Sequence, residues 1–211
     1  MRAHSYAPHQ AGGSLLEVML ALLLIAVGLL GMAALQASTA KYRVNIQAQA
    51  AVAQLVSDLA ERIRTNAGAA GPGFGVPQGG TASLYMLESS WADQAGAPPA
   101  MGKDCDRTPC SAAERAGFDM ALWRQRVREL LPQGAAVVQG DRASGIEVTL
   151  MWMDKEQLSE TRGQDGGGIT RQLRLAPVCA PDAEQAMVYH CCPGLARAPA
   201  GVRCWRMSFL P

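Results

Sequence analysis

The sequence predicts an α+β fold in which a long N-terminal helix and a second helix precede the strands of an antiparallel sheet. Three observations lead to this prediction. An uncharged apolar run near the N-terminus continues into an amphipathic segment, residues 41–65, that contains neither Gly nor Pro. A capping-box pattern opens a second amphipathic segment at Ser111. Beyond residue 134 the apolar period changes from the helical period to two.

The first helix is expected from about Ser14 to Asn66. Its first part, Val18 to Ala40, holds 23 residues without a charge. At 1.5 Å per residue this part is about 35 Å long, which exceeds the roughly 30 Å of a bilayer core. The second part carries apolar residues at spacings of three and four, which form one face of a helix: Val44, Ala48, Ala51, Leu55, Leu59 and Ile63.

The second helix is expected at about residues 112–131, after a loop rich in Gly and Pro at residues 66–80. Ser111 and Glu114 have the spacing of a capping box, and Pro132 and Gly134 stop the helix. Its apolar face is expected to contain Ala116, Met120, Trp123, Val127, Leu130 and Leu131. Strands follow at residues 135–139, 146–153 and 169–175, with one or two more between residues 188 and 209.

Composition and motifs exclude several classes of function. The net charge is +1, so no basic excess points to nucleic acid. There is no nucleophile-elbow motif, phosphate-binding loop, dinucleotide fingerprint or zinc-protease motif. Of the three His, only His190 lies outside the first 12 residues. We therefore expect a protein that is not an enzyme and that needs no cofactor.

Glu17 lies one residue before the charge-free run. In the first turn of a helix at a membrane interface, a carboxylate is favoured by the helix dipole, and this accounts for Glu17 by position alone. Its neighbours point further. They resemble the prepilin signature of type IV pilins and pseudopilins and run Gly12-Gly13-Ser14-Leu15-Leu16-Glu17-Val18.

The resemblance implies a type IV pilin-like fold and a processed N-terminus. In that family a membrane peptidase cuts after a Gly five residues before the Glu, here between Gly12 and Gly13. The new N-terminus is then methylated, so Gly13 is the expected N-methylated residue, although the family usually has an apolar residue such as Phe there. The family's Glu pairs with the N-terminal amine of a neighbouring subunit, which makes Glu17 the expected assembly carboxylate. Two buried charges of opposite sign are best neutralised together.

Two other interpretations of the N-terminus remain. A secretory signal would be cut at a small-x-small site such as Ser38–Ala40, although its apolar core would be longer than usual. A plain single-pass anchor would not be cut. The prepilin interpretation divides the chain into a leader at residues 1–12, a long helix at residues 13–66 (transmembrane at about residues 18–40) and a globular head at residues 67–211.

A second series of residues is similar to the PilV-type minor pilins, also called type IV pilus modification proteins. The matching segments are Asp104–Cys105, Cys110–Ser111, Ala116–Asp119, Trp123, Leu131–Gly134 and Gly145–Trp152. With the N-terminal motif, the resemblance covers about residues 10–66 and 104–153. It implies a minor pilin that acts in the assembly, initiation or modification of a type IV pilus.

The implied partners are other major and minor pilins, the prepilin peptidase, the inner-membrane pilus assembly machinery and the lipid bilayer, and nothing indicates nucleic acid. The implied location is the bacterial inner membrane, with the head in the periplasm, followed by the pilus at the cell surface. A minor pseudopilin of a type II secretion system is the alternative. A third hypothesis is an exported binding or enzymatic domain on a membrane anchor.

All six cysteines lie beyond residue 100, which indicates an oxidising compartment. Cys105 and Cys110 bracket a turn that contains Pro109, and a disulfide between them would fix the entry to the second helix. Cys179, Cys191, Cys192 and Cys204 allow three pairings. Adjacent Cys191 and Cys192 are expected to bond to different partners, and which bonds to which stays open. Zinc is an alternative for this cluster together with His190, although the spacing lacks a C-x-x-C pair.

Overall fold

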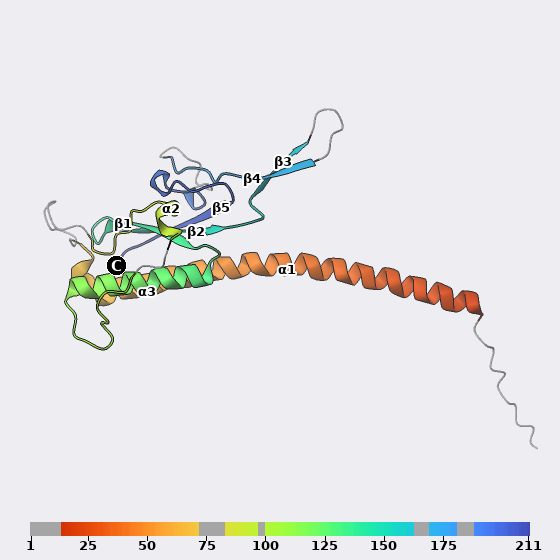
Figure 1. Cartoon of the computed structure of the whole chain (residues 1–211), viewed down its shortest axis with the longest axis horizontal. Coiled ribbons are helices and arrows are strands. Elements are labelled where there is room, and N and C mark those ends of the chain that lie inside the picture. Colours follow the sequence, from red (N-terminus) through yellow and green to blue (C-terminus); the bar gives the residue numbers. More distant parts are fainter. Residues whose placement is uncertain (1–13, 72–82, 97–99, 163–168, 181–187) are drawn as a thin grey trace, which may run out of the picture. The chain divides into compact units, whose positions relative to one another are not determined.

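The structure is a computed structural model that describes residues 14–71, 83–96, 100–162, 169–180 and 188–211. Along the chain its elements are α1 (Leu15–Thr65), η1 (Ala67–Ala69), α2 (Trp91–Gln94), α3 (Ala112–Leu130), β1 (Ala135–Asp141), β2 (Gly145–Met153), β3 (Leu158–Arg162), β4 (Ile169–Leu173), η2 (Gly194–Ala196) and β5 (Val202–Phe209) (Figure 1). Helices come first and antiparallel strands later, so the predicted α+β class is confirmed.

Helix α1 has 51 residues and agrees with its predicted bounds to within one residue at each end. The chain divides into two compact units inside this helix, Met1–Gln47 and Ala48–Pro211. We call the second unit the head unit. It contains the last part of α1, residues 48–65, in addition to the globular segment that follows the helix.

The core of the head unit begins on α1. Val52, Leu55, Leu59 and Ile63 are all at most 1% exposed. Their spacing of three and four places them on one helical face, and they join one apolar cluster with buried residues of α3, β1 and β2. From Ala48 to Ile63, the helical face predicted from the sequence is therefore the face that the head unit buries, with Ala51 half-buried. The predicted Val44 precedes the head unit.

Helix α3 starts at the predicted capping box. The Ser111 hydroxyl accepts a hydrogen bond from the Glu114 N–H at 3.3 Å, and the Glu114 carboxylate accepts one from the Ser111 N–H at 2.8 Å. The buried residues of the helix include Ala116, Met120, Trp123 and Val127. Leu130 was expected on this face and is instead 46% exposed. Leu131, also expected on this face, is 1% exposed and lies in the core, although it follows the helix in extended conformation.

The main sheet has the order β1-β2-β5, with both pairs antiparallel. In β2, Ile146, Val148, Leu150 and Trp152 share one face and join the cluster with α1 and α3. The opposite face is also buried, with Met151 packed in a second cluster that contains Trp91, Val202 and Cys204. The sheet is therefore covered on both faces. Helices α1 and α3 cover one face, and α2 together with residues around Cys192 and Ala196 covers the other.

The outer edge of β1 is closed by residues that precede α3. Leu87 exchanges two backbone hydrogen bonds with Val138 at 2.9 and 3.0 Å. The Gln94 side chain accepts from the Ala136 N–H at 3.1 Å and donates to the Ala136 carbonyl at 2.8 Å. These contacts satisfy backbone groups that an edge strand otherwise leaves exposed. The sequence alone assigned no structure to residues 81–104.

Strands β3 and β4 form a separate two-stranded sheet, with Leu158 opposite Leu173 and Arg162 opposite Ile169. Strand β4 lies within the predicted segment 169–175, but β3 was not predicted. Every residue of β4 is exposed, but the strand has apolar residues at both ends, Ile169 and Leu173, whereas β3 has one apolar residue, Leu158, and so lacks an alternating pattern. One or two strands were expected between residues 188 and 209, and the described residues of this range form β5 (Val202–Phe209).

Candidate functional site

The described part of the chain begins at the prepilin-like motif. Gly12 and Gly13, the expected cleavage and methylation positions, lie outside the described residues. Glu17 lies in the first turn of α1 and is exposed. Its backbone N–H donates to the Ser14 carbonyl at 2.9 Å and to the Ser14 hydroxyl at 3.3 Å. Ser14 therefore satisfies a free N–H at the start of the helix, and the Glu17 carboxylate is left open to solvent or to a partner.

The segment Leu15–Ala40 is a candidate membrane span of 26 residues, none of it buried. As a helix it is about 39 Å long, enough to cross a bilayer core. Its exposed residues include Leu16, Leu22, Val27 and Leu30, each more than 60% exposed. Apolar surface of this extent requires a bilayer or other apolar helices around it. The segment is therefore able to act as a signal or as an anchor.

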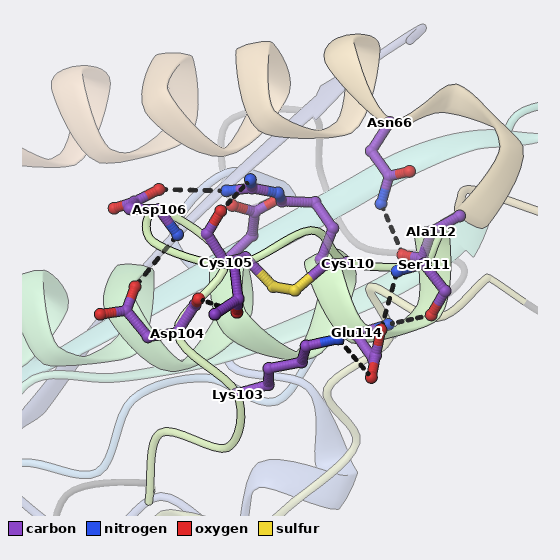
Figure 2. Close-up of a disulfide and its surroundings, with 12 residues drawn as sticks. Asn66, Lys103, Asp104, Cys105, Asp106, Cys110, Ser111, Ala112 and Glu114 are labelled. Carbon is purple, nitrogen blue, oxygen red and sulfur yellow. Dashed lines mark hydrogen bonds and ion pairs between the residues drawn. A yellow bond between two sulfur atoms is a disulfide. The ribbon is translucent and has the colours of Figure 1, made fainter.

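The first disulfide staples the loop that leads into α3. Cys105 and Cys110 are bonded, with their Cα atoms 5.6 Å apart (Figure 2). The Arg115 guanidinium donates to the Cys105 carbonyl at 2.6 Å and pairs with Asp106 at 3.2 Å. Lys103 pairs with Glu114 at 3.2 Å. The disulfide thus closes the loop on itself just before α3, as the spacing of its cysteines indicates, and the charged contacts fix the loop to the first turn of the helix.

The charge of Glu114 is stabilised where the loop meets the helix. Hydrogen bonds from the Ser111 backbone and from Lys103 lower the pKa of the Glu114 carboxyl below its usual value. Asn66, at the end of α1, donates from its side chain to the Ala112 carbonyl at 2.8 Å. Figure 2 shows this contact beside the stapled loop. The end of α1, the loop and the start of α3 therefore form one hydrogen-bonded corner.

The other four cysteines form two further disulfides. Cys179 is bonded to Cys191 and Cys192 to Cys204, with Cα separations of 4.9 and 5.3 Å. The adjacent cysteines thus have different partners, as expected. The sequence left open which partner belongs to which, and in the structure Cys191 bonds to Cys179 and Cys192 to Cys204. A sulfur in a disulfide is not a thiolate, so this pairing rules out zinc at these four cysteines. Among the described residues, no group of three or more His, Cys, Asp or Glu is arranged to hold a metal.

A buried polar network joins α1 to α3. Asp119 is only 5% exposed. Its carboxylate accepts from the Arg62 guanidinium at 3.2 Å and from the Tyr85 hydroxyl at 3.0 Å. Arg62 also pairs with Asp58 at 3.2 Å, and Asn66 donates to the Tyr85 hydroxyl at 3.0 Å. Burial, the largest cause, raises the pKa of Tyr85 above its ordinary value, so the hydroxyl keeps its proton and donates it.

Sequence reasoning missed this network. A signal was present, because Asp119 lies next to Met120 on the apolar face of the predicted helix, where an unpaired acid is unfavourable. Its partner Arg62 is 57 residues away. Trp123 is fully buried, and its indole N–H donates to the Leu55 carbonyl of α1 at 2.8 Å. Both side chains therefore fasten α3 to α1.

These features indicate the cellular compartment of the head unit. An apolar N-terminal helix that is able to act as a signal or an anchor precedes a unit with three disulfides. Disulfides persist in oxidising compartments, so the structure favours a head unit outside the cytoplasm. Comparisons with protein-family models, with curated proteins and with solved structures found no match to this chain.

Proposed function

We propose that this chain is a minor pilin of the PilV type, which is processed between Gly12 and Gly13 and joins a type IV pilus through α1. One observation carries the proposal. Helix α1 runs without a break from an apolar, unburied segment at Leu15–Ala40 into residues that the head unit buries. The apolar segment and the residues that the head unit buries thus belong to one helix, as a filament built from helices requires.

This continuity disfavours a secretory signal cut near Ala40. Such a cut would fall in the middle of α1 and would remove the apolar segment from a helix that is continuous up to Thr65. A cut at Gly13, in contrast, lies before Ser14 and leaves the whole of α1 on the mature chain. The prepilin interpretation therefore uses every part of the helix.

Glu17 has a specific role in the proposal. After cleavage between Gly12 and Gly13, the new amine lies four residues before Glu17 in the sequence. When the apolar segment enters a bundle of similar helices, both charges leave water, and each needs a partner of opposite sign. Pairing Glu17 with the amine of a neighbouring subunit neutralises both charges and fixes the register of adjacent helices. The family resemblance supplies this pairing, and the exposed carboxylate supports it.

The first test is the mature N-terminus. Mass spectrometry of the protein purified from its own membranes and sheared pili should show a chain that starts at Gly13 with a methylated amine. A chain that starts at Lys41, or one that keeps Met1, would refute the processing step. Recovery of the protein in sheared pili would identify it as a pilin. A pseudopilin of a secretion system should instead depend on the secretion machinery for its assembly.

The second test replaces Glu17. Glu17→Gln keeps the shape of the side chain and removes its charge, so insertion into the membrane should remain while incorporation into pili falls. A charge at the centre of a bilayer costs roughly 2.5–3.5 kcal/mol on insertion scales, and every 1.4 kcal/mol or so is a tenfold change, so we expect incorporation to fall by about tenfold or more. Glu17→Asp should recover part of the incorporation. Glu61→Gln is the matched control, because Glu61 is an exposed acid of the same helix in the head unit. Equal incorporation of the Glu17→Gln and Glu61→Gln variants would remove the assembly role.

A further inference from the structure

The three disulfides follow the order of the cysteines along the chain. The first cysteine bonds to the second, the third to the fourth and the fifth to the sixth: Cys105–Cys110, Cys179–Cys191 and Cys192–Cys204. The sequence separations are 5, 12 and 12 residues. No bridge encloses or crosses another. Each native pair therefore becomes available as soon as its second cysteine reaches the oxidising side of the membrane.

This order of bonding is ambiguous only for the adjacent pair, Cys191 and Cys192, because both reach the oxidising side of the membrane together. Exchange of their partners would close two loops that are each only one residue longer than the native loops. Loop-closure entropy varies with the logarithm of loop length, so it does not distinguish the two arrangements. The choice must come from the folded backbone.

The backbone around Cys192 supplies this choice. Its N–H donates to the Pro177 carbonyl at 2.8 Å, and its carbonyl accepts from the Cys179 N–H at 3.0 Å, which forms a parallel bridge between Val178 and Cys192. In an extended segment, successive side chains point to opposite sides. The side chain of Cys192 can therefore face Cys204 while that of Cys191 faces Cys179.

The position of Cys204 is fixed by the pairing of β5 with β2. Cys204 lies opposite Met151 in the pairing of β5 with β2. Cys192, Cys204 and Met151 are each at most 3% exposed and belong to the second apolar cluster of the head unit. Docking of β5 on β2 therefore brings Cys204 to Cys192 inside the apolar cluster. Cys191 bonds outside this cluster, beside the Val188 carbonyl at 3.4 Å.

We propose that the head unit is a substrate of a disulfide-donating thiol oxidase and that it reaches its native pairing without a disulfide isomerase, because the bridge at Cys192 and the register of β5 sort the adjacent cysteines. For each bridge, a cysteine thiolate attacks the disulfide of the donor and forms a mixed disulfide. The second cysteine thiolate then displaces the donor. Two protein thiols are oxidised, and the donor disulfide takes up two electrons and two protons to become two thiols. This inference does not depend on the proposed pilin function.

The full chain, reduced and denatured, tests the proposal when it is refolded in detergent micelles with glutathione disulfide as the donor. Parallel samples contain or lack a protein disulfide isomerase. The yield of chains without free thiols, measured by alkylation and mass spectrometry, should agree within twofold between the samples. A yield that rises more than twofold with the isomerase would overturn the proposal, as would a failure of the donor alone to close the bridges.

Two variants identify the partners of the adjacent cysteines. No Lys or Arg lies between Cys179 and Cys192, so trypsin leaves Cys179, Cys191 and Cys192 on one peptide of the natural chain. Cys191→Ser should keep the bridge from Cys192 to Cys204 and leave Cys179 open to alkylation. Cys192→Ser should keep the bridge from Cys179 to Cys191 and leave Cys204 open.

The opposite result is equally clear. A main product that joins Cys179 to Cys192 in the first variant, or Cys191 to Cys204 in the second, would show that the fold does not sort the pair. Tryptophan fluorescence reports whether each variant has folded. The refolding comparison on the natural chain decides the isomerase requirement even if a variant does not fold.

Discussion

Replacement of Asp119 by Ala should destabilise the head unit more than removal of any exposed acid. The variant removes two contacts at once, with the Arg62 guanidinium at 3.2 Å and with the Tyr85 hydroxyl at 3.0 Å. Tyr85 is fully buried, and its remaining acceptor, the Arg62 carbonyl, is 3.4 Å away. The hydroxyl therefore loses its only short acceptor.

The expected magnitude follows from burial. A hydrogen bond to a charged group contributes roughly 1.5–3 kcal/mol, and a buried ion pair that loses one partner costs about 3–5 kcal/mol. The Arg62 side chain is 18% exposed and keeps its pair with Asp58, which offsets part of the second cost. We therefore expect a loss of about 2–3 kcal/mol in the free energy of unfolding. For a unit of this size the melting temperature should fall by about 5–10 °C.

The assay is guanidinium chloride unfolding of the full chain in detergent micelles, with disulfides intact. Tryptophan fluorescence reports on the head unit, because it contains all four tryptophans: Trp91, Trp123, Trp152 and Trp205. Asp58→Ala is the control. Asp58 pairs with Arg62 and Arg126 but is 24% exposed, so its loss should cost less than about 1 kcal/mol. If Asp119→Ala costs no more than Asp58→Ala, the reasoning that the network fastens α3 to α1 is wrong.

Two further predictions concern the same helices. Ser111→Ala removes the side-chain cap of α3 and should lower the free energy of unfolding by about 1 kcal/mol, measured by the same denaturation; no change would mean that the stapled loop alone holds the helix start. Because burial raises the pKa of Tyr85, the folded state keeps a proton that the unfolded state releases above about pH 10. Stability should be present below that pH and decline above it. Tyr85→Phe should flatten the decline measured from about pH 9 to about pH 11, whereas Tyr189→Phe, at an exposed position, should not; equal profiles for the two variants would contradict this assignment.

Features with a short-range cause were predictable from the sequence. The bounds of α1 follow from an apolar period and from the Gly and Pro that end it, and the start of α3 follows from Ser111 and Glu114 three residues apart. Strands β1 and β2 follow from the change of the apolar period to two, whereas the bounds of β5 within residues 188–209 were not predicted. The candidate membrane span follows from the length and the apolar composition of its segment alone. In each case the residues that determine the feature lie within one or two turns of it.

Features that depend on distant partners were not predictable in the same way. Strand β3 has one apolar residue, Leu158, and α2 has only four residues, so neither carries a sufficient period. Leu130 matches the apolar face of α3 by spacing, but the chain leaves the helix there and Leu131 enters the core instead. The cleavage site, the assembly carboxylate and the pilus itself remain predictions from the motif.

The sequence by itself determined the continuous helix, its apolar first part, the α+β order and the separation of Cys191 from Cys192 into different bridges. These properties depend on local period, local composition and the strain of a disulfide between adjacent residues, whose Cα atoms are only about 3.8 Å apart. The tertiary structure decided the contact of Asp119 with Arg62 and the bonding of Cys192 to Cys204. Both join segments that only the packing of α3 on α1 and the register of β5 on β2 bring within bonding distance.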